Sequence, residues 1–303
     1  MSCDATVIVI AAEPDPAGCN SDRSAGMARR AIGRLGELEQ QWSRFRPTSE
    51  ISGLNAAGGE PRIVSADTLR LVEALVQAWH ATEGAFDPTL LGALVELGYA
   101  ASRDDATLRT SLASDVMPRG RPADILVEPS TRWVQMPPGT TLDPGGLGKG
   151  LAADIVVEEL IAAGALGALV EIGGDIRVAG TPPSGDTWTI SVAPMTPDGP
   201  PRIVQLADGG VATSSSRLRT WRRNGARQHH LVDPRTLRSA DTGAVSCTVI
   251  AGSAAWAEAF TKIAFADDTA NAMVRYDIRR LAASISTADE THHDSTSWKE
   301  FCG

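Results

Sequence analysis

A series of short strand-like segments fills the chain from Leu166 onward, and it constrains the fold more than any other feature. Each segment is rich in β-branched and other apolar residues, and Gly, Pro or Asp separates one from the next. The segments read GALVEI, DIRVAG, DTWTISVA, RIVQLA, GVATSS, HHLVD and SCTVIAG. Short strands joined by turn residues are typical of an antiparallel sheet, so we expect one in this part of the chain.

Amphipathic patterns between the strands indicate helices, so the expected fold class is α+β. Residues 6–11 are a β-branched apolar run that predicts a buried strand, and after it apolar residues recur at steps of three and four from about Ser21 to Phe45. Ser65 can cap a second helix that stops at Gly84. We also expect a hairpin over residues 123–136 and helices over residues 151–164, from Ser253 onward and over residues 271–282.

The composition argues against a nucleic-acid partner, a zinc or disulfide framework and a membrane span. The net charge is -9, and Lys and Arg are scattered, which argues against a nucleic-acid partner. The four cysteines lack CxxC spacing, so they indicate neither a zinc site nor a disulfide framework. No apolar run reaches the ~18–20 residues that span a bilayer, and neither a signal peptide nor a lipobox precedes Cys3. As sequenced, we expect a cytoplasmic protein with one domain over residues 1–303 and no transmembrane segment.

The most distinctive polar segment is glycine-rich and runs from Asp143 to Gly150, at the start of an expected helix. Glycines let main-chain N–H groups approach a ligand, a helix N-terminus favours anions, and Lys149 adds a charge suited to phosphate. The spacing matches neither a P-loop nor the GxGxxG fingerprint. The segment therefore predicts a nucleotide phosphate site, with a tight turn and a surface lysine as the alternative.

Two further sets of polar residues each admit two interpretations. His230, on a strand that leads to an Asp-Pro turn, is a candidate general base, or else a solvated or core histidine. Glu258, Thr261 and Lys262 share one face of the helix expected after Ser253. Carboxylate and hydroxyl oxygens suit Mg²⁺, whereas Glu and Lys alone could form an ordinary solvated pair.

Three loops complete the set of candidate functional segments. Residues 42–55 and 84–89 each follow a helix and combine an aromatic ring with polar side chains, as a planar ligand would need. Each could equally be a capped loop. The IGGD segment at residues 172–175 could be an ordinary hairpin turn, and alone it decides little.

Taken in order, these segments resemble the motifs of the FAD:protein FMN transferase family, the ApbE-like flavin transferases. The matches span nearly the whole chain. They are SRF then SxxN between Ser43 and Asn55, GAFDP from Gly84, DxGGxxKGxxxD from Asp143 to Asp154, IGGD from Ile172, ATS from Ala212, HHLVDPRT from His229, and an alanine-rich helix ending in Phe265.

The resemblance implies an α+β fold of two related halves, with mainly antiparallel sheet and packed helices, and a nucleotide cleft between them. It implies transfer of FMN from FAD to a Ser or Thr hydroxyl of a target protein, with release of AMP. His230 would be the base, and Lys149 would act near the ribose or phosphates. The residues implied in FAD binding are Cys3 (through its main chain), Phe45, Asn55, Ala85, Phe86, Asp87, Asp143, Gly145, Lys149, Asp175, Ser214, His230 and Val232.

The metal helix departs from the family's motif. Where the family reads DxxxT, this chain has Glu258 in place of Asp and Lys262 in place of Thr. The resemblance still implies Mg²⁺, with the Gly146 carbonyl, Glu258 and Thr261 as its ligands. Alternatively, the ammonium of Lys262 takes the place of the cation and pairs with Glu258.

A second departure concerns two glycines of the family's motifs, which are replaced here by Leu237 after DPRT and by Ser215 after ATS. A turn that needs a positive φ would suit Leu237 less well than glycine. The alternatives to a protein-flavinylating enzyme are a protein that hydrolyses FAD and one that only binds it, with transferase activity reduced or lost. Members of the family are often extracytoplasmic.

Overall fold

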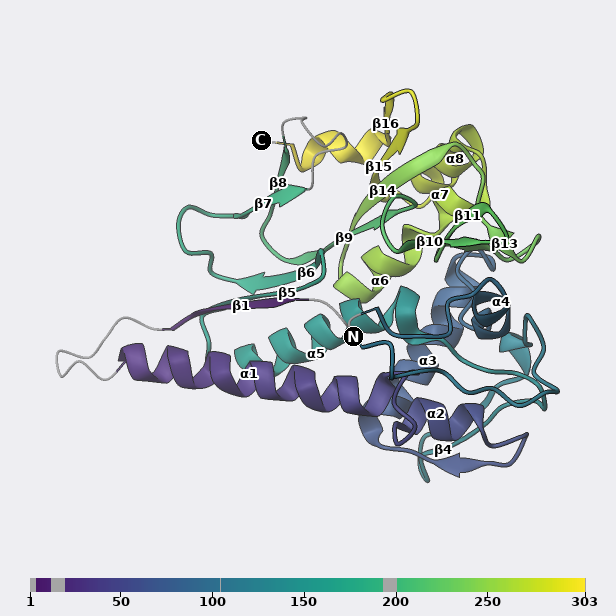
Figure 1. Ribbon diagram of the computed structural model, residues 1–303. Helices are drawn as coiled ribbons and strands as arrows, with labels where there is room; N and C mark the ends of the chain where they lie inside the picture. Colours follow the sequence, from purple (N-terminus) through teal and green to yellow (C-terminus); the bar gives the residue numbers. More distant parts are fainter. Residues whose placement is uncertain (1–3, 12–19, 104, 193–200, 303) are drawn as a thin grey trace.

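One antiparallel sheet forms the centre of the protein (Figure 1). The computed structural model describes residues 4–11, 20–103, 105–192 and 201–302. Every neighbouring pair of strands in this sheet is antiparallel. In order across the sheet, the described strands are β1 (Ala5–Ile10), β5 (Gly167–Ile172), β6 (Asp175–Gly180), β9 (Gly209–Ser215), β14 (Ala244–Ala251), β15 (Ala282–Thr287) and β16 (His292–Asp294).

Helices α1 (Asn20–Trp42), α5 (Gly148–Ala162) and α6 (Ala254–Phe260) lie on one face of the sheet (Figure 1). α5 packs on β5 and β6, α6 packs on β9 and β14, and the two helices contact each other. Two similar helix-on-strand units therefore lie side by side. In α1, the buried residues recur at steps of three and four along one face, and they are Met27, Ala31, Leu35, Leu38 and Trp42.

The hairpin of β7 (Trp188–Val192) and β8 (Arg202–Leu206) covers the opposite face together with η3 (Thr296–Glu300). Trp188 and Trp298 are buried there against Val178 and Ile250 of the sheet. Because side chains alternate along a strand, Val178 faces this core while Ala179 faces the helices.

The remaining elements surround the end of the sheet where α5 begins and α6 ends. On one side lie α2 (Glu50–Asn55), α3 (Ala66–Ala81), α4 (Leu91–Glu96), η1 (Pro122–Asp124) and a small sheet of β2 (Arg62–Ile63), β4 (Trp133–Gln135) and β3 (Leu126–Glu128). The others are η2 (Pro144–Gly146), α7 (Ile263–Ala266), α8 (Thr269–Ile278) and the strand pairs β10 (Thr220–Arg223) with β11 (Ala226–His229) and β12 (Val232–Asp233) with β13 (Arg238–Ser239).

The α+β class and the mainly antiparallel sheet are confirmed. The cap at Ser65 is confirmed too, because its Oγ accepts a 3.2 Å hydrogen bond from the N–H of Thr68. The hairpin expected over residues 123–136 is present as β3 and β4. The IGGD segment is a two-residue turn between β5 and β6, with φ of 58° at Gly173 and 93° at Gly174.

The helix expected from Ser253 is interrupted at Thr261 and Lys262, so that α6 and α7 are separate. The N–H of Lys262 bonds the carbonyl of Ala259 instead of that of Glu258. The Glu258 carbonyl accepts instead from the Thr261 hydroxyl at 2.6 Å and from the Lys262 ammonium at 2.9 Å. Side-chain donors thus replace one main-chain bond, and they end the α-helical pattern.

Three other expectations were wrong in detail. The first strand is present, but it is an edge strand and not a buried one, since Ile8 is 38% exposed. The HHLVD segment is not one strand, because β11 ends at His229 and β12 begins at Val232. The helix expected over residues 271–282 ends at Ile278, after which the chain turns into β15.

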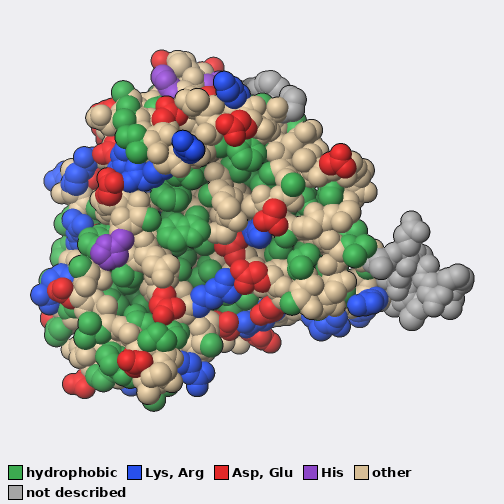
Figure 2. All heavy atoms as spheres, turned by 180° about the vertical axis from the view of Figure 1, so that it is seen from behind, with side chains coloured by type: hydrophobic (Ala, Val, Ile, Leu, Met, Phe, Trp, Pro, Cys, Tyr) green, Lys and Arg blue, Asp and Glu red, His purple; other side chains and the backbone are tan. Residues whose placement is uncertain are grey.

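The described helices include none that is both long and apolar enough to cross a membrane. On the face of the molecule in Figure 2, Lys and Arg side chains lie among Asp and Glu side chains, with hydrophobic side chains between them.

Candidate active site

One cleft brings together residues from all the motif segments. Its walls come from the loop after α1, the loop after α3, the glycine segment before α5, the β5–β6 turn, β9, the loop before β12, and the α6–α7 junction. The predicted site residues that line it are Phe45, Ala85, Phe86, Asp87, Asp143, Gly145, Gly146, Lys149, Asp175, Ser214, His230, Val232, Glu258 and Lys262.

Two of the predicted residues that the structure describes, Asn55 and Thr261, do not line the cleft. Cys3 lies outside the described residues. Asn55 forms a two-way clamp with Leu142, because its Nδ2 donates to the Leu142 carbonyl at 2.9 Å and its Oδ1 accepts from the Leu142 N–H at 2.7 Å. Asn55 therefore positions the chain just before Asp143. Thr261 is buried behind the wall and shares a 2.7 Å hydrogen bond with the Ser214 hydroxyl.

The aromatic wall of the cleft consists of Phe45 and Tyr99, with Arg44 between them. The Arg44 guanidinium carbon lies 4.1 Å from the ring centre of Phe45 and 4.8 Å from that of Tyr99. Its Nη1 donates to Thr110 at 2.7 Å, and its Nε lies 3.5 Å from a carboxylate oxygen of Asp143. Arg44 thus holds the aromatic wall beside the glycine segment.

The glycine segment approaches its neighbours too closely for side chains at two positions. A Cβ on Gly146 would lie 2.9 Å from the Phe86 ring and 3.2 Å from Cε of Lys262. A Cβ on Gly150 would lie 2.4 Å from the carbonyl oxygen of Ala254 at the start of α6. These glycines let α5 and α6 meet, and they place the segment directly against the cleft.

The last aspartate of the DxGGxxKGxxxD motif, Asp154, has a structural contact. Its two carboxylate oxygens accept from the N–H groups of Ala254 at 2.8 Å and Ala255 at 2.9 Å. Arg177 lies 3.3 Å from the same carboxylate. Asp154 therefore caps the N-terminus of α6 from α5 and fixes how the two helices meet.

Lys149 is only 8% exposed, so the interpretation of this residue as a surface lysine was wrong. Its ammonium pairs with the buried carboxylates of Asp175 and Glu258, the latter at 2.6 Å. Burial alone would lower the pKa of Lys149, but the charges of Asp175 and Glu258 outweigh it and raise that pKa above its ordinary value. Burial, together with the nearby charge of Glu258, raises the pKa of Asp175 to about 6.

Glu258 faces the start of α5 with both carboxylate oxygens. Oε1 accepts from Lys149, and Oε2 accepts from the N–H of Gly150 at 2.9 Å. Burial opposes ionisation, but the ammonium groups of Lys149 and Lys262 lower the pKa of Glu258 below its usual value. Glu258 is therefore a carboxylate whose two oxygens already have protein donors.

His230 lies on the cleft wall between β11 and β12. Burial lowers its pKa well below the ordinary value, and the positive charges of Arg219 and Lys262 add to that effect. Its Nδ1 is buried without a hydrogen-bond partner among the described residues. The imidazole is therefore neutral near pH 7, and no hydrogen bond from a described residue to Nδ1 fixes which nitrogen carries the proton.

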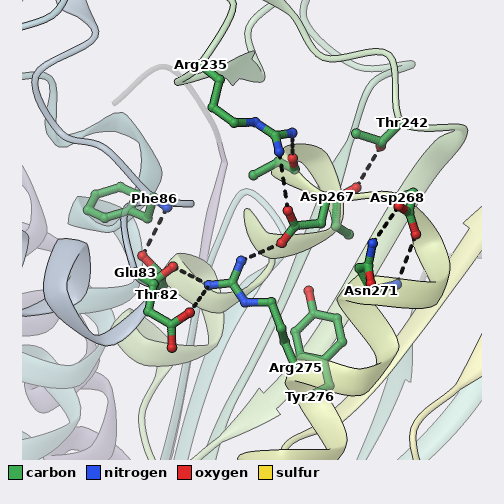
Figure 3. A network of polar contacts seen from close by, with 12 residues as sticks. Thr82, Glu83, Phe86, Arg235, Thr242, Asp267, Asp268, Asn271, Arg275 and Tyr276 are labelled. Atoms are coloured by element: carbon green, nitrogen blue, oxygen red, sulfur yellow. Dashed lines mark hydrogen bonds and ion pairs between the residues drawn. The ribbon is translucent and has the colours of Figure 1, made fainter.

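A polar network holds the loop of Ala85, Phe86 and Asp87 against α7 and α8 (Figure 3). Arg275 donates to the carbonyl of Thr82 and to Asp267, both at 2.5 Å, and the Thr82 hydroxyl accepts from the N–H of Phe86 at 3.0 Å. Arg235, from the turn after β12, bonds the Ala266 carbonyl and so ties that turn to α7. Two walls of the cleft are thus connected.

The sequence interpretation missed several residues that line the cleft. Arg44 lies next to a predicted residue in the SRF motif, so a check of the neighbours of Phe45 would have found it. Tyr99 and Arg219 come from segments without a motif, and no local signal marked them. Arg219 has a φ of 47°, and its guanidinium makes no hydrogen bond or ion pair with another described residue.

The fold is that of solved flavin transferase structures. Over 99% of this chain and 96% of the other, it matches an ApbE protein from Thermotoga maritima with a TM-score of 0.84 and 24% identity. The apo form of the Pseudomonas stutzeri flavinyl transferase ApbE gives a TM-score of 0.80 and 22% identity, over 99% of this chain and 93% of that one.

The chain belongs to the ApbE family, whose family model matches residues 1–284. It is 31% identical to the FAD:protein FMN transferase of Vibrio cholerae over 222 residues, which are 71% of this chain and 66% of that protein. It is 29% identical to the FAD:protein FMN transferase of Rhodobacter capsulatus over 77% of this chain and 45% of that protein. The matched regions thus cover under two thirds of these two relatives, and the family resemblance of the motifs is confirmed.

Proposed function

We propose that this chain transfers FMN from FAD to a Ser or Thr hydroxyl of an acceptor protein and releases AMP, as one domain over residues 1–303. The observation that carries the proposal is the convergence in one cleft of an aromatic wall, a glycine segment at a helix N-terminus and a neutral histidine. The relatives named FAD:protein FMN transferase support it.

The cleft offers different chemistry to the two parts of FAD. The rings of Phe45, Tyr99 and Phe86 suit the planar isoalloxazine. The glycine segment and the cations Lys262 and Arg219 suit the diphosphate. Lys149, which already pairs with two carboxylates, shapes this part of the wall rather than providing a free charge.

The proposed reaction is a displacement at the phosphorus of the FMN half of FAD. The acceptor oxygen forms a bond to that phosphorus, and the bond from it to the bridging oxygen breaks. The electron pair leaves with AMP, and His230, neutral near pH 7, takes the proton of the hydroxyl. Positioning and charge neutralisation supply most of the rate enhancement in reactions of this kind.

A Mg²⁺ ion held by Gly146, Glu258 and Thr261, as implied by the family resemblance, does not fit the residues as they are arranged. The Glu258 carboxylate has two protein donors, and the Thr261 hydroxyl bonds the Glu258 carbonyl. No group of three or more His, Cys, Asp or Glu side chains among the described residues could hold a metal ion. The proposed reaction therefore has no step that depends on a bound metal ion.

The test is to incubate the purified protein with FAD and an acceptor protein that exposes Ser and Thr hydroxyls. Chromatography measures AMP and free FMN, and fluorescence in a denaturing gel measures covalently attached flavin. Transfer predicts AMP together with gel-stable flavin, and His230→Ala should abolish both while FAD still binds. AMP with an equal amount of free FMN would indicate FAD hydrolysis, and FAD that binds without AMP formation would indicate a binding protein.

A further inference from the structure

Two of the three lysines in the chain, Lys149 and Lys262, line the same cleft. Among the described residues, Lys262 has only uncharged oxygens within hydrogen-bonding distance of its ammonium. Its Nζ lies 2.9 Å from the main-chain oxygen of Glu258, 3.1 Å from Ser214 Oγ and 3.1 Å from Thr261 Oγ1. Lysine ammonium groups in proteins more commonly pair with carboxylates or face water.

The hydroxyls around Lys262 form a directed chain. The Thr261 hydroxyl donates to the Glu258 carbonyl at 2.6 Å, so its oxygen can accept from Ser214 at 2.7 Å. Both hydroxyl oxygens then present lone pairs to the ammonium. Distances near 3 Å suit hydrogen bonds from an ammonium, whereas Mg²⁺ requires oxygens at about 2.0–2.1 Å and at least one carboxylate or phosphate oxygen as a rule.

The charges of the neighbouring residues show what Lys262 changes. Lys149 with Asp175 and Glu258 carries a net charge of one negative unit, which would repel a diphosphate. Lys262 brings this group of four to neutrality, and its Cε borders the glycine segment, 3.2 Å from where a Cβ on Gly146 would lie. Lys262 is therefore the charge that makes this part of the cleft compatible with an anion.

We propose that the ammonium of Lys262 takes the place of a divalent metal ion at the end of the cleft that holds the diphosphate. The chain then binds FAD without such an ion. This inference rests on the proposed function, because it assigns the phosphates of FAD as the partner of Lys262. During transfer, the phosphate of the departing AMP gains negative charge, and the ammonium stabilises that charge without giving up a proton. Ser214, Thr261 and the break between α6 and α7 hold the ammonium in place.

The first experiment measures FAD binding by calorimetry with protein stripped of metals by EDTA, and again with added Mg²⁺. At pH 7 we expect the two affinities to agree within about twofold, since Lys262 belongs to the chain itself and, with a pKa that burial lowers to about 8, is mostly protonated there. A loss of more than about tenfold on chelation would overturn the inference and restore a metal site. If FAD fails to bind under both conditions, the proposed function itself is wrong, and the inference falls with it.

The second experiment removes the charge with Lys262→Met and compares FAD with riboflavin, which lacks phosphate. We expect FAD affinity to fall roughly tenfold to a hundredfold, as for a lost charge-assisted contact, while riboflavin affinity stays unchanged. Lys299→Met, which removes the remaining lysine from an exposed position, is the matched control and should bind both as the wild type does. Equal losses for the two ligands, or no loss for FAD, would contradict the proposal. Should the Met variant fail to fold, the chelation experiment on the wild type still decides.

Discussion

The ammonium of Lys149, in the first turn of α5, donates a 2.6 Å hydrogen bond to Oε1 of Glu258 in α6. The two residues are 109 positions apart in the chain. The contact joins the two helix-on-strand units, and Asp175 of the β5–β6 turn completes the cluster. Lys149, which the glycine-rich motif associates with phosphate, thus forms a buried structural contact between the two units.

Lys149→Met should destabilise the protein by about 3–5 kcal/mol, because it leaves the buried carboxylates of Asp175 and Glu258 without their cation. Urea unfolding at pH 7.5, followed by circular dichroism, measures the free energy of unfolding. Lys299→Met removes an exposed lysine and should change it by less than about 0.5 kcal/mol. An unchanged midpoint for the Lys149 variant would mean that the cluster contributes little.

The sequence was sufficient to predict the architecture and most of the cleft wall, because both depend on local patterns. Alternating strands with turn residues predicted the antiparallel sheet, and Ser65 and Ser253 marked helix starts that the structure has as caps. The ordered motifs predicted residues that, apart from Asn55 and Thr261, line one cleft where the structure describes them. Motif order carried this information, since each segment alone had an ordinary structural interpretation.

The contacts within the cleft could not be predicted, because they join residues far apart in the chain. The pairing of the Glu258 carboxylate with Lys149, and not with Lys262, depends on how α5 meets α6. The break at Thr261 depends on side chains that bond a main-chain carbonyl. Arg219 comes from a segment rich in arginine, where no spacing distinguishes the one that reaches the cleft.

Leu237 stands where the family has a glycine, at a turn that was expected to need a positive φ. Its φ is 59°, so it does adopt the left-handed conformation. Leu237→Gly should be more stable than Leu237→Ala by about 1 kcal/mol, since both lose the same side-chain contacts apart from one methyl group but only alanine keeps the strain. Thermal unfolding of the two variants side by side measures this difference. If alanine proved as stable as glycine, backbone strain at Leu237 would be negligible.

The lowered pKa of His230 predicts a pH dependence of stability. Above pH 6.5, the ordinary value, both folded and unfolded states hold a neutral imidazole, and the contribution of His230 is fully present. Below it, the unfolded state takes up a proton first, so this contribution is lost as the pH falls through the folded pKa. The free energy of unfolding of the wild type should therefore drop more between pH 7.5 and 5 than that of His230→Gln.

Urea unfolding at several pH values compares the two proteins, with His292→Gln as a variant that removes an exposed histidine. NMR of the imidazole protons gives an independent reading, because the pKa of His230 should lie below the ordinary histidine value. Parallel pH profiles for the wild type and His230→Gln would show that His230 titrates alike in the folded and unfolded states.

The guanidinium of Arg219 lies at the cleft, and it has no hydrogen-bond or ion-pair partner among the described residues. Burial lowers the pKa values of both His230 and Lys262, and the positive charge of Arg219 lowers them further. Arg219 is therefore within electrostatic reach of the two groups assigned to proton transfer and phosphate binding. An unpaired cation at that position suits the phosphates of FAD. Arg219→Ala should therefore weaken FAD binding by roughly 1–3 kcal/mol, with little effect on folding.

Arg217→Ala is the matched control for Arg219, since it removes an exposed arginine two residues away that does not line this cleft. Calorimetry with FAD and with riboflavin separates a contact to phosphate from a contact to the flavin ring. We expect Arg219→Ala to lose affinity for FAD alone, and its weakening to grow smaller as the salt concentration rises, because salt screens a partly exposed charge. If riboflavin binding weakened by the same factor, Arg219 would contact the ring system and not the phosphates. If the two arginine variants bound FAD equally well, Arg219 would not contribute to FAD binding.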